Sequence, residues 1–119
     1  MRTIAFLASW SGRVLAVVLF AFWGAFFVHH LAWFLHPGQG LPPARVWLLQ
    51  LVHLVLLAGL LTLLRWEIPG GLLTIAAALV FFAAVAGRNF LLFFGVTILP
   101  VLLILLGRLL QGQAATNPP

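Results

Sequence analysis

The fold is decided by residues 45–88, which read RVWLLQLVHLVLLAGLLTLLRWEIPGGLLTIAAALVFFAAVAGR. Charged residues in this stretch stand only at its two ends and in one turn at residues 65–67. The turn is preceded by 19 uncharged residues and followed by 20. An α-helix rises 1.5 Å per residue, so about 20 apolar residues cross a bilayer core of roughly 30 Å. The stretch therefore predicts two membrane spans joined by a tight turn.

The same spacing continues on both sides of this stretch. The chain carries 31 uncharged residues between Arg13 and Arg45, and 19 between Arg88 and Arg108. None of these segments alternates polar and apolar residues strictly, as a membrane β-barrel would. Short connections make neighbouring helices antiparallel. We therefore predict one all-α domain, residues 1–119, that forms an up-down four-helix transmembrane bundle with short loops. The predicted spans cover about residues 12–35, 45–65, 69–86 and 89–110.

Composition agrees with lipid as the solvent of most side chains. Of the 119 residues, 65% are hydrophobic and 6% are charged, whereas about 25% of a soluble domain is charged. Such a chain is neither a water-soluble enzyme nor a disordered segment, and without cysteine it is no disulfide scaffold. Six dispersed arginines against one acid give a net charge of +5. They form no basic patch of the kind that binds nucleic acid, so the expected partner is the bilayer.

The two ends of the chain are predicted from polarity and charge. Residues 1–11 either lie in the membrane interface or extend the first helix. Residues 111–119 form a polar tail that we expect to be unstructured alone. Four spans place both termini on one side of the membrane. The positive-inside rule makes that side the cytoplasm, because it holds four arginines against two. The four are Arg2, Arg13, Arg65 and Arg108, and the two are Arg45 and Arg88.

The residue types that membrane catalysis and transport use are mostly missing. The chain has no Asp, Lys, Cys or Tyr, and no charge in the middle of a predicted span. Proton-coupled transporters and pumps usually keep an intramembrane carboxylate or basic partner. No serine stands at hydrolase spacing from a histidine or lysine. We therefore expect no enzyme, and a small transporter or channel is only a second alternative.

Histidines are the main chemical lead. His29, Trp33 and His36 share one face of the first span, and His30 lies on an adjacent face. His53 lies about 12 Å inside the second span, and His29 about 9 Å inside the first from the same side. Antiparallel helices would bring His29 or His30 level with His53. We favour an interfacial cluster with His53 hydrogen-bonded across helices. The alternative is a cofactor site in which His29, His30 and His53 hold haem, a chlorophyll-type pigment or a metal ion.

Two single residues predict local features. Glu67, the only acid, precedes the third span, where the helix dipole favours a carboxylate. It shares a predicted membrane side with Arg13, Arg65 and Arg108, so we expect a helix cap and an ion pair that fix the turn. Pro100 interrupts the fourth span and is expected to kink it.

The turn also carries a family resemblance. An early histidine in one helix, an Arg-Trp-Glu turn and a following Gly-Gly pair resemble a widespread group of small, uncharacterised four-helix bacterial integral membrane proteins. The resemblance implies the four-span fold and a location in the bacterial inner, or plasma, membrane. It implies no activity, because the group has no established function. Its structural-turn residues here are Arg65, Trp66, Glu67, Gly70 and Gly71.

Phenylalanines give the functional expectation. The first and fourth spans hold more of them than the core of so small a bundle accommodates, so some must face lipid or another protein. We therefore expect a structural or accessory role, as a peripheral subunit of a larger membrane complex. The contact would use the first or fourth helix and the C-terminal tail. The phenylalanines concerned are Phe20, Phe22, Phe26, Phe27, Phe90, Phe93 and Phe94.

Overall fold

The protein is a bundle of long helices. Its structure, a computed structural model, describes residues 2–34 and 43–116, apart from the side chains of residues 33, 34 and 113–116. No strand occurs in these ranges. All four α-helices are long and apolar enough to cross a membrane, which confirms the predicted all-α, four-span bundle. The elements are α1 (Arg2–Phe34), α2 (Ala44–Leu63), α3 (Glu67–Val85), the short 3₁₀ turn η2 (Gly87–Asn89) and α4 (Phe90–Thr116).

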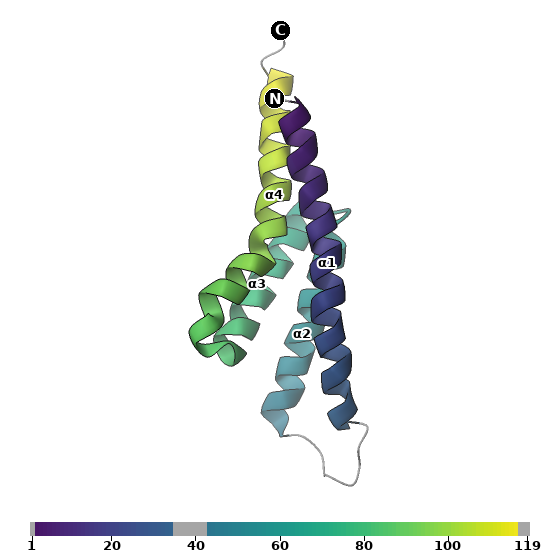
Figure 1. Ribbon diagram of the computed structural model, residues 1–119, viewed down its shortest axis with the longest axis vertical. Helices are drawn as coiled ribbons and strands as arrows, with labels where there is room; N and C mark the ends of the chain where they lie inside the picture. The colour runs from purple at the N-terminus through teal and green to yellow at the C-terminus, as the bar shows by residue number, and fades with distance from the viewer. Residues whose placement is uncertain (1, 35–42, 117–119) are drawn as a thin grey trace.

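Helix lengths give the molecule its shape. Within principal extents of 68 × 24 × 19 Å, α1 packs mainly against α4, and α2 mainly against α3. Figure 1 shows that the start of α1 and the end of α4 run together beyond the α2–α3 turn. At the opposite end, α3 and the first half of α4 lean away from α1 and α2. The described bundle is therefore narrow at the end where α1 begins and α4 ends, and splayed at the other.

We take the ion pair of Arg13 and Glu67 as the edge of the hydrocarbon layer on α1, because charged side chains are costly inside it. Glu67, at the start of α3, is bonded to Arg13 of α1. From Arg13 to the end of α1 the helix rises about 33 Å, close to the roughly 30 Å of the hydrocarbon layer. Residues 2–12 extend about 16 Å beyond this level. Of the two alternatives for residues 1–11, the structure shows that residues 2–11 extend the first helix.

Helix α4 also runs further than expected. The sequence predicts a polar tail from residue 111, but α4 continues to Thr116, and residues 117–119 lie outside the described ranges. Close packing against α1 precedes this extension. At Gly107 an added Cβ would lie 2.9 Å from the carbonyl oxygen of Ala5 and 3.0 Å from Ser9. Backbones this close supply the van der Waals contact that holds membrane helices together.

Small residues make the other close contacts between helices. A Cβ added at Gly12 would lie 2.6 Å from Cγ1 of Ile104 and 2.8 Å from the carbonyl oxygen of Pro100. A Cβ added at Gly59 of α2 would lie 2.7 Å from the hydroxyl of Thr74 in α3. Of the four spans, α3 has the largest buried share, 39% of its most apolar 18-residue window.

A bend in α4 connects the α1–α4 pair with the α2–α3 pair. Helix α4 contains Pro100 and changes direction part-way along its length (Figure 1). Proline has no N–H for the preceding turn, and its ring pushes against that turn, so a kink follows. The bend agrees with the predicted one. It allows α4 to contact both α1 and α3.

Candidate functional site

An ion cluster joins the start of α3 to α1 and α4. Nη2 of Arg13 donates to Oε1 of Glu67 at 2.7 Å, and Nη1 of Arg108 donates to Oε2 at 3.5 Å. The Glu67 side chain is 18% exposed. The predicted pairing is therefore confirmed for two of the three candidate arginines, and it ties α3 to α1 and α4. Arg65 is placed differently, with its guanidinium carbon 5.2 Å from the centre of the Trp66 ring.

The other turn residues serve packing. The predicted cap by Glu67 is not found: the N-cap residue is Trp66, which makes no side-chain cap bond, and Glu67 is the first residue of α3, within reach of the helix dipole. Gly70 packs against the backbone of Leu63, where a side chain would not fit. A Cβ added at Gly71 would lie 3.0 Å from Cγ1 of Val101 in α4. The Gly-Gly pair therefore lets α3 approach α2 on one side and α4 on the other.

His53 is one of two described residues with a buried side-chain polar atom that lacks a hydrogen-bond partner; the other is Thr74. Its side chain is 1% exposed, and Nε2 lies 2.9 Å from the carbonyl oxygen of Trp23. A carbonyl oxygen only accepts, so Nε2 carries the hydrogen and Nδ1 of the neutral ring keeps a lone pair. Nδ1 is buried and has no hydrogen-bond partner. An unpaired buried polar atom costs about 1–3 kcal/mol, so this nitrogen is a candidate contact for a ligand.

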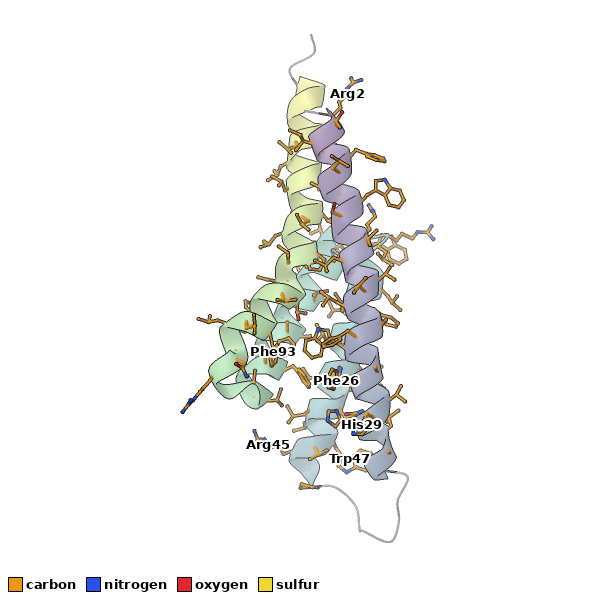
Figure 2. All side chains as sticks on the ribbon, in the orientation of Figure 1. Arg2, Phe26, His29, Arg45, Trp47 and Phe93 are labelled. Atoms are coloured by element: carbon orange, nitrogen blue, oxygen red, sulfur yellow. The ribbon has the colours of Figure 1, made fainter. Side chains whose placement is uncertain are left out.

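All four helices border a cavity of about 120 Å³ beside His53. Figure 2 shows Phe26 of α1 and Phe93 of α4 between the two sides of the splayed end, which are α1 with α2 and α3 with the first half of α4. A second hollow of about 230 Å³ adjoins it, and the two share His30, Phe81 and Val85. The walls of the first are mostly aromatic: Trp23, Phe26, Phe81, Phe82 and Phe93, with His30, His53, Val85 and Ala86.

Trp23 lines this space and is held by a hydrogen bond to α4. Nε1 of Trp23 donates to the hydroxyl of Thr97 at 3.1 Å, a bond between α1 and α4. The Trp23 ring centre lies 5.1 Å from that of Phe82 and 5.8 Å from that of Phe93. Sequence reasoning missed both hydrogen-bonding residues. The available signal was that a buried indole N–H and a buried hydroxyl each need a partner.

Two hydrogen bonds lie towards the splayed end. Nη2 of Arg45, in the first turn of α2, donates to the carbonyl oxygen of Ala84 near the end of α3 at 3.1 Å. Nε2 of Gln50 donates to the carbonyl oxygen of Phe27 in α1 at 3.1 Å. These bonds join α2 to α3 and to α1 around the second hollow of about 230 Å³, which Gln50 also lines. We call it the outer hollow.

The structure separates the three predicted histidines. His30 borders both hollows with His53 as its neighbour across the first. His29 is exposed, and its ring centre lies 6.1 Å from that of His30. His36 and the side chain of Trp33 lie outside the described residues. The favoured interpretation, with His53 bonded across helices, agrees with the bond to Trp23.

The cofactor alternative stays a prediction. Among the described residues, no group of three or more His, Cys, Asp or Glu is placed to hold a metal ion. The space beside His53, about 120 Å³, is also below the roughly 300–1,000 Å³ of most small-molecule pockets. This conformation suits a single small ring better than a macrocycle.

A groove lies on the outer surface of α1, next to the ion cluster. It encloses about 530 Å³ and is lined by Trp10, Arg13, Val14, Val17 and Leu64. Apart from the arginine and the indole N–H, its lining side chains are hydrocarbon.

Comparison with protein-family models, with curated proteins and with solved structures returned no match for this chain. The resemblance carried by the turn residues therefore stays a prediction, and function has to be argued from the geometry.

Proposed function

We propose that this small membrane protein is a structural or accessory subunit of a larger complex in the bacterial inner membrane. The observation that carries the proposal is apolar surface on the part of α1 that extends beyond the ion cluster. In the proposal, both termini lie in the cytoplasm, and the partner docks on α1.

The exposed surface begins outside the hydrocarbon layer. Phe6 and Trp10 are 57% and 54% exposed and lie about 10 Å and 5 Å beyond the level of Arg13. Ile4 and Leu7 on the same segment are also more than half exposed. The headgroup region adds only about 5–8 Å on each side of the hydrocarbon core. Lipid tails therefore leave the outermost of these side chains uncovered, and such exposed apolar surface is typical of an interaction site.

The docking surface continues into the membrane without a break. Phe6, Trp10, Val14 and Val17 follow a spacing of three and four residues, so they share one face of α1. The last three line the groove of about 530 Å³. This apolar face is continuous from the hydrocarbon layer to the segment beyond it. Such a face can bind an α-helix of another membrane protein. Inside the hydrocarbon layer, helices are held together by close van der Waals packing more than by the hydrophobic effect.

The test compares purification partners of matched variants in gentle detergent. We expect the double variant Phe6→Ser/Trp10→Ser to lose a protein that co-purifies with the unmodified chain, because the docking face loses most of its outer apolar area. The control is Leu91→Ser, an exposed side chain at the other end of the molecule. A variant without residues 111–119 measures the contribution of the tail.

Identification uses photo-crosslinking from position 14, which lines the same groove and is unchanged in the double variant, followed by mass spectrometry. The proposal predicts one dominant partner that disappears in the double variant and remains in the control. A chain that runs alone as a monomer, or equal recovery with all variants, would contradict the subunit role. Crosslinking of the chain only to other copies of itself would indicate a homo-oligomer and contradict the role as a subunit of a larger complex.

A further inference from the structure

We propose that the cavity beside His53 binds a membrane-soluble phenol, meaning a single aromatic ring with a hydroxyl group. The hydroxyl would donate to Nδ1 of His53, and the ring would lie among the aromatic walls. This binding site goes beyond the proposed subunit role and does not depend on it.

The unpaired nitrogen defines the polar part of the ligand. Because Nε2 of His53 donates to the Trp23 carbonyl oxygen, the ring is held in one orientation and Nδ1 remains an acceptor. A matching ligand must therefore offer a donor, which excludes carboxylates, ketones and ethers. An ordered water is a poorer match, because a buried water needs two to four polar partners. The walls beside His53 are mainly hydrocarbon and aromatic.

The size and lining of the cavity define the apolar part. Its volume is about 120 Å³, close to the roughly 150 Å³ of an engineered apolar protein cavity that takes up benzene. Aromatic rings stack edge-to-face or offset with one another, and the Trp23 and Phe93 rings beside the space already meet edge to face, at an angle of 84°. The adjoining hollow of about 230 Å³ has room for substituents on the ring.

The position of the site selects a lipid-soluble compound. His53 lies about 12 Å from Arg45 along α2, well inside the hydrocarbon layer. The outer hollow, lined by His30, Val46 and Gln50, lies between the site and the end of the helix. A ligand that reaches the inner cavity therefore comes from a compound pool dissolved in the membrane.

Binding is tested with 4-fluorophenol on the full-length chain in nanodiscs of neutral lipid. The matched control compound is 4-fluoroanisole, which has the same ring but no donor. ¹⁹F NMR measures how tightly each compound binds. ¹⁵N NMR of the histidine-labelled protein reports on the His53 Nδ1 resonance, identified by its loss in His53→Phe. We expect saturable binding of 4-fluorophenol with an upfield shift of this resonance, and at least ten-fold weaker binding of 4-fluoroanisole.

Two variants separate the acceptor from the cavity. His53→Phe keeps an aromatic ring without the acceptor, and Ala86→Phe fills the cavity while His53 stays in place. Each is expected to weaken 4-fluorophenol binding at least ten-fold, whereas Ala21→Phe, on the exposed side of α1, leaves it unchanged. The inference is overturned if the two compounds bind equally, or if the phenol signal changes linearly as simple partitioning into lipid predicts. Unchanged binding in folded Ala86→Phe would overturn it even where His53→Phe fails to fold.

Discussion

Glu67 shows how much one charged residue organises in an apolar chain. Each of its two carboxylate oxygens accepts a bond from a different arginine, one on α1 and one on α4. The pair with Arg13 is shielded, with side chains 24% and 18% exposed, while Arg108 is 58% exposed. Exposed ion pairs contribute only about 0–1 kcal/mol, so the contact with Arg13 should provide most of the stabilisation.

Replacing Arg13 should therefore destabilise the fold more than replacing Arg108. Arg13→Ala removes a charge-assisted hydrogen bond worth about 1.5–3 kcal/mol. Arg108→Ala and the control Arg65→Ala should each cost about 1 kcal/mol or less. Unfolding in mixed micelles titrated with sodium dodecyl sulfate gives the three free energies. Equal losses for Arg13→Ala and Arg65→Ala would show that the ion pair does not stabilise the turn.

The bond between Trp23 and Thr97 gives a second prediction at this scale. Thr97→Val keeps the shape but leaves the indole N–H unpaired at a site only 7% exposed, at a cost of about 1–3 kcal/mol. Thr97→Ser keeps the acceptor and should be close to neutral. In a Trp23→Phe background, the penalty for Thr97→Val should largely vanish. A double-mutant cycle on the same unfolding assay measures this coupling, and additive losses would argue against the bond.

Residues that could be predicted from the sequence are those with few possible partners. A single acid among arginines on one membrane side limits Glu67 to three partners, and two of them are used. Trp23 could not be placed in the same way. In a membrane helix the lipid-facing and protein-facing sides are both apolar, so hydrophobic periodicity does not separate them.

At the scale of whole helices, close approach depends on a few glycines. In α1, Gly12 faces Ile104 and the backbone at Pro100, whereas a Cβ at Gly24 would meet nothing within 4 Å. The same substitution at Gly12 and at Gly24 therefore makes the same chemical change to α1, but only the change at Gly12 affects the packing against α4.

Gly12→Leu should loosen the contact between α1 and α4, because a side chain cannot enter without moving α4 backbone. Overpacking of this kind typically costs about 1–3 kcal/mol. Gly24→Leu should leave stability within about 0.5 kcal/mol of the unmodified chain. Thermal unfolding in lipid nanodiscs compares the two. If both melt at the unmodified temperature, α1 and α4 do not pack as described.

Span boundaries were predicted well where charges lie at helix ends and poorly where they lie within helices. The predicted 45–65 and 69–86 agree with α2 and α3 to within two residues. For α1 and α4, the predicted spans begin at residue 12 and end at residue 110, close to Arg13 and Arg108. Both helices continue past them, because each arginine pairs with Glu67 at mid-helix and need not terminate the helix.

At the scale of the whole molecule, the position of the ends relative to the membrane can be tested directly. The chain contains no cysteine, so each introduced one is a unique label site. Thr3→Cys and Gln111→Cys lie at the end of the bundle where α1 begins and α4 ends, and Asn89→Cys lies between α3 and α4 at the other end. All three positions are exposed.

A membrane-impermeant maleimide applied to intact cells without their outer membrane should label only Asn89→Cys. The other two variants should react only in inside-out vesicles, because the arginine excess places both termini in the cytoplasm. Labelling of Thr3→Cys and Gln111→Cys on opposite sides would contradict the four-span arrangement. Labelling of both variants from outside would show that the orientation is the reverse of the predicted one, with the four-span fold unchanged.

The candidate site was predictable only in part. Counting residues along antiparallel helices brings a histidine of the first span level with His53, and His30 is the one that borders its cavity. The cavity itself depends on the direction of α4 after its bend and on the lean of α3. A proline predicts a kink, but the direction in which the two segments separate is set by packing that a sequence pattern does not contain.

In the proposed membrane position, the splay of the helices gives the protein a different cross-section in each leaflet. Where Glu67 ties α3 to α1 and α4, the cross-section is small, and where the helix pairs lean apart it is larger (Figure 1). Opening the bundle further displaces lipid from one leaflet only, so work against lateral pressure in that leaflet opposes it. Crowded or ordered acyl chains would therefore press the pairs together and shrink the space beside His53. Looser chains would enlarge it, which couples the physical state of the bilayer to access at a buried imidazole.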